Sequence, residues 1–192
     1  MTKELFKNDF RSYAAVSLLG IAAGLTVAFF SRFPADDFWG LAFFSSGTFG
    51  FWFFSSSLIA LFSSKNYVAG INVACYVYFM FYLTGIFKRL AIVQKGYNTM
   101  QYFLEGLWQE LAYGLPYAAI CFGLAFALWY GRKNKVIFVI LRFLPAGFIF
   151  AELVILTIGF ISSGRGLFMP LVDALCLAVY LTIMLRTLKK KE

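Results

Sequence analysis

Apolar residues run along this chain in long stretches that short polar segments separate. Six stretches have about the 20 residues that a helix needs to cross a hydrocarbon layer roughly 30 Å thick. They cover residues 12–31, 38–63, 67–87, 112–130, 136–162 and 168–185. Proline and paired acids break the chain after the first stretch, at Pro34, Asp36 and Asp37. The pattern predicts an all-α, polytopic integral membrane protein with six transmembrane helices, residues 1–192 forming a single six-helix transmembrane domain.

The connection between the third and fourth stretches has a different pattern. Over residues 100–111, apolar side chains recur at helical spacing, with Gln101, Glu105 and Gln109 on the opposite side. The apolar side consists of Met100, Phe103, Leu104, Leu107, Trp108 and Leu111. We predict one interfacial amphipathic helix here, lying along the external membrane surface before the fourth span begins at residue 112.

Composition and charge support the prediction of a membrane protein and add its orientation. Of the 192 residues, 61% are hydrophobic and 14% are charged, which excludes a soluble globular domain. The net charge of +8 does not indicate nucleic acid, because the basic residues gather at helix ends. Eleven of the 17 Lys and Arg residues lie at the termini and in the 2–3 and 4–5 connections. The positive-inside rule therefore predicts a multi-pass protein of the cell membrane, of the bacterial inner-membrane kind, with both termini cytoplasmic.

Several classes of enzyme are excluded by what the chain lacks. It has no histidine, which removes His-dependent phosphatases, rhomboid-type Ser–His proteases and HExxH metalloproteases. Its cysteines, Cys75, Cys121 and Cys176, are far apart and lie in apolar stretches, so they indicate small buried residues and no metal site. The surroundings of Asp173 do not resemble those of an intramembrane aspartyl protease. We expect no cofactor and no enzymatic activity.

Small residues recur on one side of each of the first two spans. In the first span they are Gly20, Gly24 and Ala28, four residues apart. In the second span, Ser46 and Gly50 belong to a similar narrow band. Such faces let a neighbouring helix approach closely. They fit packing within the bundle or docking of a membrane partner subunit.

Three ionisable residues lie inside apolar stretches, where a charge costs at least ~2.5–3.5 kcal/mol on insertion scales. Arg142 is seven residues beyond Lys135, so its long side chain can reach the interface. Asp173 follows Pro170 by three residues, and the positive end of a helix dipole can stabilise it there. Neither explanation applies to Glu152, because it lies far from both ends of its span.

Glu152 and Asp173 lie at similar depth on neighbouring antiparallel spans, in the predicted outer half. Two carboxylates there can accept a small cation, an amine-bearing solute or a proton. Asn72, Tyr76 and Tyr82, in the third span, either line the same cavity or form hydrogen bonds between helices. The candidate ligand site therefore comprises these five residues.

Six helices in about 190 residues, cytoplasmic termini, the Gly20, Gly24 and Ala28 spacing and a substantial external connection resemble the S-components of energy-coupling-factor transporters. That resemblance implies solute binding near the outer surface and docking of the first helix on a coupling subunit. We therefore expect a solute-binding or transport subunit with a polar cavity in the outer half. The alternative is a non-catalytic accessory, immunity or assembly protein that acts through helix surfaces, and a proton-linked carrier is a third hypothesis.

Overall fold

The computed structural model describes residues 4–30, 33, 49–96, 98–132 and 136–189. This part of the chain is helical, and its one β-like feature is an isolated bridge between Phe6 and Ser63. Five of its helices are long and apolar enough to cross a membrane, and α2 is shorter. The elements are α1 (Phe10–Phe30), α2 (Gly50–Phe62), α3 (Asn66–Gln94), α4 (Met100–Trp129), η1 (Tyr130–Arg132), α5 (Val136–Ser163) and α6 (Phe168–Lys189).

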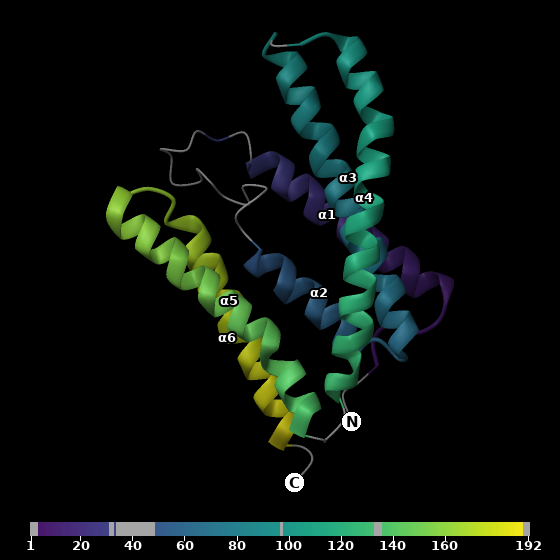
Figure 1. Cartoon of the computed structure of the whole chain (residues 1–192), viewed down its shortest axis with the longest axis vertical. Coiled ribbons are helices and arrows are strands. Elements are labelled where there is room, and N and C mark those ends of the chain that lie inside the picture. Colours follow the sequence, from purple (N-terminus) through teal and green to yellow (C-terminus); the bar gives the residue numbers. More distant parts are fainter. Residues whose placement is uncertain (1–3, 31–32, 34–48, 97, 133–135, 190–192) are drawn as a thin grey trace.

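Two helical hairpins flank α2 (Figure 1). Helices α3 and α4 form one hairpin, which turns at Gly96 with a φ of 75°, a left-handed conformation that suits glycine. Helices α5 and α6 form the other, joined through Gly164 and Gly166, both also at positive φ. Helix α2 contacts both hairpins and so connects the two halves of the molecule.

Helix α1 packs across α3 through its small residues. A Cβ at Gly20 would collide with the backbone carbonyl oxygen of Tyr76, and one at Gly24 would lie 2.7 Å from that of Met80. Ala28 is also buried, at 4% exposure. The two backbones approach closely because these positions carry almost no side chain. The small face of α1 is therefore occupied by α3 of the same chain.

Hydrogen bonds gather the N-terminal segment, the α2–α3 turn and the end of α4 at one end of the molecule. Leu5 donates its N–H to the Phe62 carbonyl at 3.0 Å, and the Trp129 indole donates to the Ser63 carbonyl at 2.9 Å. The Asn66 amide donates to the Tyr130 hydroxyl at 3.0 Å. The tips of the two hairpins point the other way (Figure 1). Successive helices therefore run up and down, as a polytopic chain requires.

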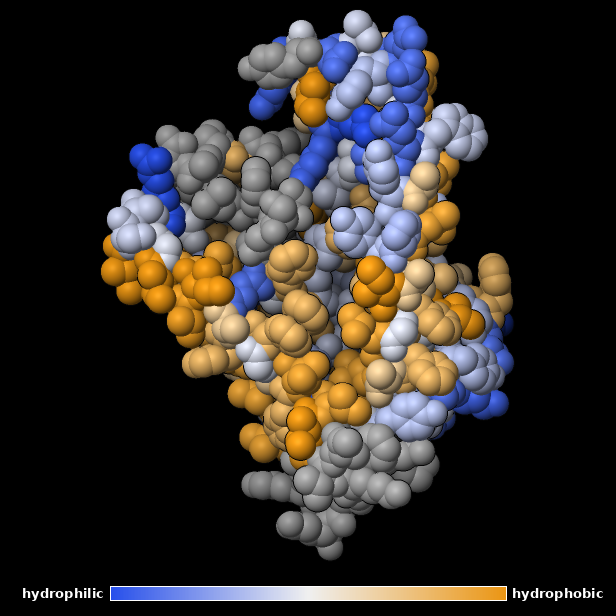
Figure 2. All heavy atoms as spheres, in the orientation of Figure 1, coloured by the Kyte–Doolittle hydropathy of each residue, from blue (hydrophilic) through white to orange (hydrophobic). Residues whose placement is uncertain are grey.

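The predicted boundaries around the 3–4 connection are wrong. Helix α3 continues past residue 87 to Gln94, and α4 is one helix of 30 residues, with no break between the amphipathic segment 100–111 and the span that follows. Amphipathicity changes which face is apolar but does not interrupt backbone hydrogen bonding, and the next proline, Pro116, is accommodated inside the helix. Figure 2 shows the far end of this hairpin as hydrophilic and the surfaces of α5 and lower α4 as hydrophobic.

Part of the predicted second span lies outside the described residues. This applies to residues 38–48, and so to Ser46 among the predicted packing residues. The described part, α2, has 13 residues and begins at Gly50. Its first turn is where the two halves of the molecule meet, and the candidate site lies there.

Candidate functional site

The first turn of α2 is capped by a carboxylate from another helix. The N-cap residue, Phe49, has no side-chain oxygen that could accept from the free N–H groups at a helix start. Instead, Glu152 of α5 accepts a 2.6 Å hydrogen bond from the Phe49 N–H. The positive end of the helix dipole favours an anion at this position. One role of Glu152 is therefore to hold the start of α2 against α5.

Asp173 of α6 contacts the same turn from the other side. Its side chain is fully buried, and a Cβ at Gly50 would collide with its carboxylate, so the missing side chain of Gly50 makes room for it. Neither carboxylate oxygen of Asp173 has a hydrogen-bond partner within the described part of the chain. Glu152 lies close enough to interact with it electrostatically. Buried polar groups normally have partners, so Asp173 is an exception that requires an explanation.

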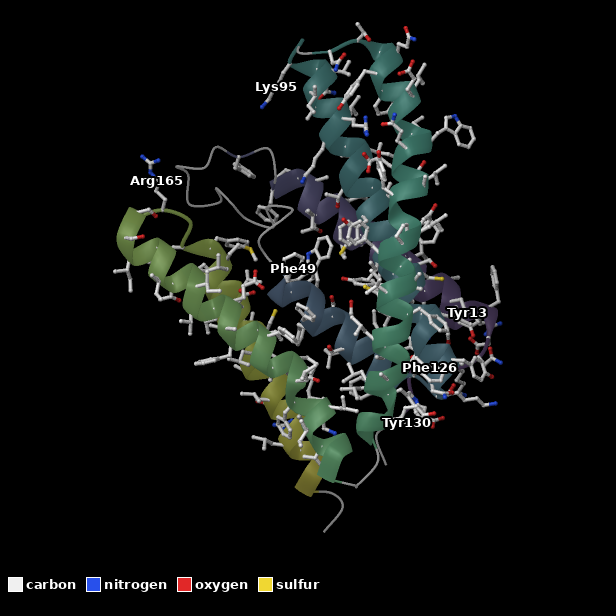
Figure 3. The ribbon with its side chains drawn as sticks, viewed as in Figure 1. Tyr13, Phe49, Lys95, Phe126, Tyr130 and Arg165 are labelled. Carbon is white, nitrogen blue, oxygen red and sulfur yellow. The ribbon has the colours of Figure 1, made fainter. Side chains whose placement is uncertain are left out.

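An apolar cleft of about 470 Å³ lies beside this turn, between α5 on one side and α2, α3 and α4 on the other. Its lining is almost wholly apolar and includes Ser56 and Ser57 as small polar side chains. Aromatic rings form much of the wall: Phe49, Trp52, Phe53, Phe81, Tyr117 and Phe148. Figure 3 shows Phe49 at the start of α2, between the two hairpins.

The acidic pair lies just beyond one end of the cleft. Neither Glu152 nor Asp173 lines it. Phe49 does, and its backbone N–H binds Glu152. Phe148 also lines the cleft and precedes Glu152 by four residues, about one helical turn or 5.4 Å along α5. Phe148 stacks on Phe53 at 4.9 Å between ring centroids. The cleft and the carboxylates are therefore neighbours that share the first turn of α2.

The structure brings together only some of the predicted site residues. Glu152 and Asp173 meet at the start of α2, whereas Asn72, Tyr76 and Tyr82 make their contacts elsewhere and do not line the cleft. The Tyr76 hydroxyl donates to the Ser55 hydroxyl at 2.9 Å, and the Asn72 amide donates to Ser63 at 3.3 Å. These are hydrogen bonds between helix α3 and the α2 region, one of the two roles expected for them.

Tyr82 points toward a different partner. Its ring stacks on that of Tyr78, with 6.3 Å between centroids and 4° between planes. The Tyr78 hydroxyl in turn lies 3.5 Å from the Leu111 carbonyl oxygen of α4. Tyr82 therefore packs on a residue of the α3–α4 interface, Tyr78.

Sequence reasoning missed a second polar cluster, inside the α3–α4 hairpin. Arg89 donates from Nε to Glu110 at 2.7 Å and from Nη2 to Gln109 at 3.0 Å. Its guanidinium also lies 5.0 Å from the centre of the Tyr102 ring, which is a cation–π distance. This cluster borders a more polar pocket of about 330 Å³. The signal in the sequence was the pair of glycines that faces it, Gly85 and Gly106.

Arg142 does not extend to the surface as expected. Its side chain is only 4% exposed, and its Nε donates to the Gly131 carbonyl at 2.8 Å. The Tyr180 hydroxyl donates to the Arg142 carbonyl at 2.8 Å. The arginine therefore ties the end of η1 to α5, which explains its position near the start of this span.

Comparison with protein-family models, curated proteins and solved structures gives no match for this chain. The described residues contain no cluster of three or more His, Cys, Asp or Glu side chains that could hold a metal ion. The site is thus defined by its own geometry: two carboxylates lie at a helix start beside an aromatic cleft, and one of them has no hydrogen-bond partner in the part of the chain that the structure describes.

Proposed function

We propose that this protein is an integral membrane solute-binding or transport subunit for a small cationic or amine-bearing solute with an apolar body. The observation that carries the proposal is Asp173, which is fully buried against the first turn of α2, next to the apolar cleft, and whose two carboxylate oxygens have no hydrogen-bond partner among the described residues. The apolar body occupies the cleft, and the positive charge lies toward Glu152 and Asp173. We further propose that the role is non-enzymatic.

Electrostatics supports this assignment. A carboxylate taken out of water must be paired, hydrogen-bonded or protonated, because an isolated buried charge is costly. Glu152 already accepts from the start of α2. Asp173 has no such donor within the described part of the chain, so a cation near Asp173 gains the most electrostatic stabilisation. The cleft then supplies affinity through apolar burial, and the acids supply the preference for positive charge.

The same proposal includes an orientation in the membrane. Six spans with both termini cytoplasmic place the acidic pair in the outer half, and the hydrophilic end of the α3–α4 hairpin, with residues 100–111, at the outer interface. The basic-residue count and the alternating helix directions support it. Lys133→Cys and Arg165→Cys, each in a cysteine-free background, should label oppositely with an impermeant reagent. Labelling of Lys133→Cys from outside intact cells would contradict this orientation.

Binding is tested with the purified protein in lipid nanodiscs. Radiolabelled phenylpropylamine and its trimethylammonium derivative both carry one positive charge at about pH 7. At least one should bind saturably, and Asp173→Asn should weaken that binding by about tenfold or more. Glu105→Gln is the matched control, because Glu105 is an exposed acid of α4 remote from the cleft. Absence of saturable binding, or equal binding by both variants, would overturn the proposal and favour an accessory role.

A further inference from the structure

The cleft beside the acidic pair is lined by aromatic rings from four helices. Trp52 of α2 meets Phe81 of α3 edge-on, with 4.4 Å between ring centroids. Phe81 then stacks on Tyr117 of α4 at 5.2 Å. Across the cleft, Phe148 of α5 stacks on Phe53 of α2 at 4.9 Å. Two sets of packed rings therefore face the same space.

Aromatic walls discriminate between kinds of cation. The face of a ring attracts positive charge, and this attraction is largest when the cation gives up little hydration. A primary ammonium group carries three N–H donors that each require an acceptor when buried. Among the described residues, the lining is apolar apart from a few groups such as the hydroxyls of Ser56, Ser57 and Tyr117, and neither carboxylate belongs to it. The cleft therefore satisfies a cation without N–H groups better than one with them.

The position of the acids fits a diffuse charge. Glu152 lies one helical turn beyond Phe148, and its carboxylate is already bound to the Phe49 N–H. Asp173 is behind Gly50, in contact with the same turn of α2. Both carboxylates thus adjoin the turn of α2 that begins at Phe49, a lining residue, yet neither carboxylate is itself in the lining, where it could accept a short hydrogen bond from a ligand. A site that attracts a cation without direct contact selects for positive charge and does not select for N–H donors on the ligand.

We propose, on the basis of the proposed function, that the solute is a hydrophobic cation lacking N–H donors, such as a quaternary ammonium or phosphonium compound, and that the aromatic rings of the cleft determine this specificity. Its apolar body lies between the Trp52–Phe81 and Phe53–Phe148 pairs. Its charged end lies at Phe49 and Phe148, toward the acids.

The test compares the affinities of three probes that share one apolar body. Each affinity is measured by how well the probe displaces a radiolabelled probe from the protein in nanodiscs. Phenylpropyltrimethylammonium has no N–H group, phenylpropylamine has three, and phenylpropanol is neutral. We expect the trimethylammonium probe to bind about tenfold tighter than the amine, and the alcohol to bind most weakly. Phe148→Leu should reduce the first ratio by about threefold or more, since it keeps apolar volume but removes a ring face. Phe150→Leu is the matched control, because Phe150 lies on the same helix but outside the cleft.

The outcomes separate the two proposals. If the amine binds as tightly as the trimethylammonium probe and Asp173→Asn still weakens both, the specificity proposal is wrong and the cation-binding function stands. If Phe148→Leu and Phe150→Leu change the ratio equally, the rings do not determine specificity. If the alcohol binds as tightly as both cations, the cleft is a site for apolar chains such as lipid tails, and both proposals fail.

Discussion

In the part of the chain that the structure describes, acidic side chains join helices in the α3–α4 hairpin and at the start of α2, and these two clusters differ in how their charges are satisfied. In the α3–α4 hairpin, Arg89 and Glu110 form an ion pair at 2.7 Å. Gly85 and Gly106 make room for it, since a Cβ at either position would collide with one of the two side chains. At the start of α2, by contrast, Glu152 and Asp173 bring two acids together, and neither forms a salt bridge with a basic side chain of the described residues.

The difference indicates different roles. A complete pair holds two helices together, and removing one partner leaves the other buried and uncompensated. An incomplete cluster opposes folding unless a proton or a cation supplies what is missing. Such residues inside membrane spans commonly mark ligand or ion sites. The α3–α4 cluster therefore serves structure, and the α2 cluster is the place to seek a ligand.

The largest effect is expected from breaking the complete cluster. Glu110→Ala should lower the free energy of unfolding by about 2–3 kcal/mol, less than for a fully buried pair because the two side chains are 14% and 20% exposed. Unfolding in mixed micelles measures it. The double variant Arg89→Ala, Glu110→Ala should lose less unfolding free energy than the sum of the losses in the two single variants. Additive losses would show that the pair is not coupled.

A smaller loss is expected where a glycine makes room for an acid. Gly50→Ala should destabilise the protein by about 1–2 kcal/mol, because its Cβ would overlap the buried Asp173 carboxylate. The same change at Gly123 is the control, since a Cβ there would meet nothing within 4 Å. Thermal unfolding of the two variants should differ. Equal melting temperatures would show that the α2 cluster is loosely packed.

The incomplete cluster should respond in the opposite direction to the complete one. Asp173→Asn should raise the free energy of unfolding by about 1 kcal/mol in the absence of ligand, because it removes a buried charge that has no hydrogen-bond partner among the described residues and removes its repulsion from Glu152. Denaturant titration of the ligand-free protein checks it. A loss comparable to that of Glu110→Ala would mean that Asp173 is already paired, which would contradict the contrast between the clusters.

The smallest effect concerns a carboxylate that caps a helix in the ordinary way, outside the membrane. Asp9 accepts a 2.7 Å hydrogen bond from the Ser12 N–H at the start of α1, and this bond lowers its pKa below the usual 3.8. Its stabilisation is therefore present above that value and lost as the pH falls through the lowered pKa. Hydrogen exchange at Ser12 should be faster in Asp9→Asn than in the native protein at about pH 5, and the difference should vanish near pH 2. A difference that persists in acid would mean that the carboxylate charge is not involved.

Much of the helical architecture could be predicted from the order of residues alone. Long apolar stretches form helices in any surroundings that exclude water, because each backbone N–H and carbonyl must then be paired within its own segment. Five of the predicted spans therefore fall on described helices long and apolar enough to cross a membrane, although two of those helices, α3 and α4, extend well beyond the predicted bounds. The spacing of Gly20, Gly24 and Ala28 likewise identified a face that admits close packing, although it left open which helix would use it.

The positions of helix ends in polar regions were harder to predict. The change from amphipathic to apolar near residue 111 suggested a boundary, yet α4 is continuous from Met100 to Trp129. A change of hydropathy does not break a hydrogen-bond ladder. Only a lost donor, a left-handed residue such as Gly96, or competing tertiary contacts can end it.

What the sequence determined by itself is the class of protein: apolar helices, too many and too long for a soluble core, with two acids that needed an explanation. The tertiary structure decided what those acids contact. Glu152 caps a helix whose N-cap residue, Phe49, lies 103 residues earlier in the chain, and Asp173 fits against the bare backbone of Gly50. Helical periodicity is local and places a side chain on a face. Which backbone groups and which rings of other helices meet that face is fixed only when the hairpins pack around α2.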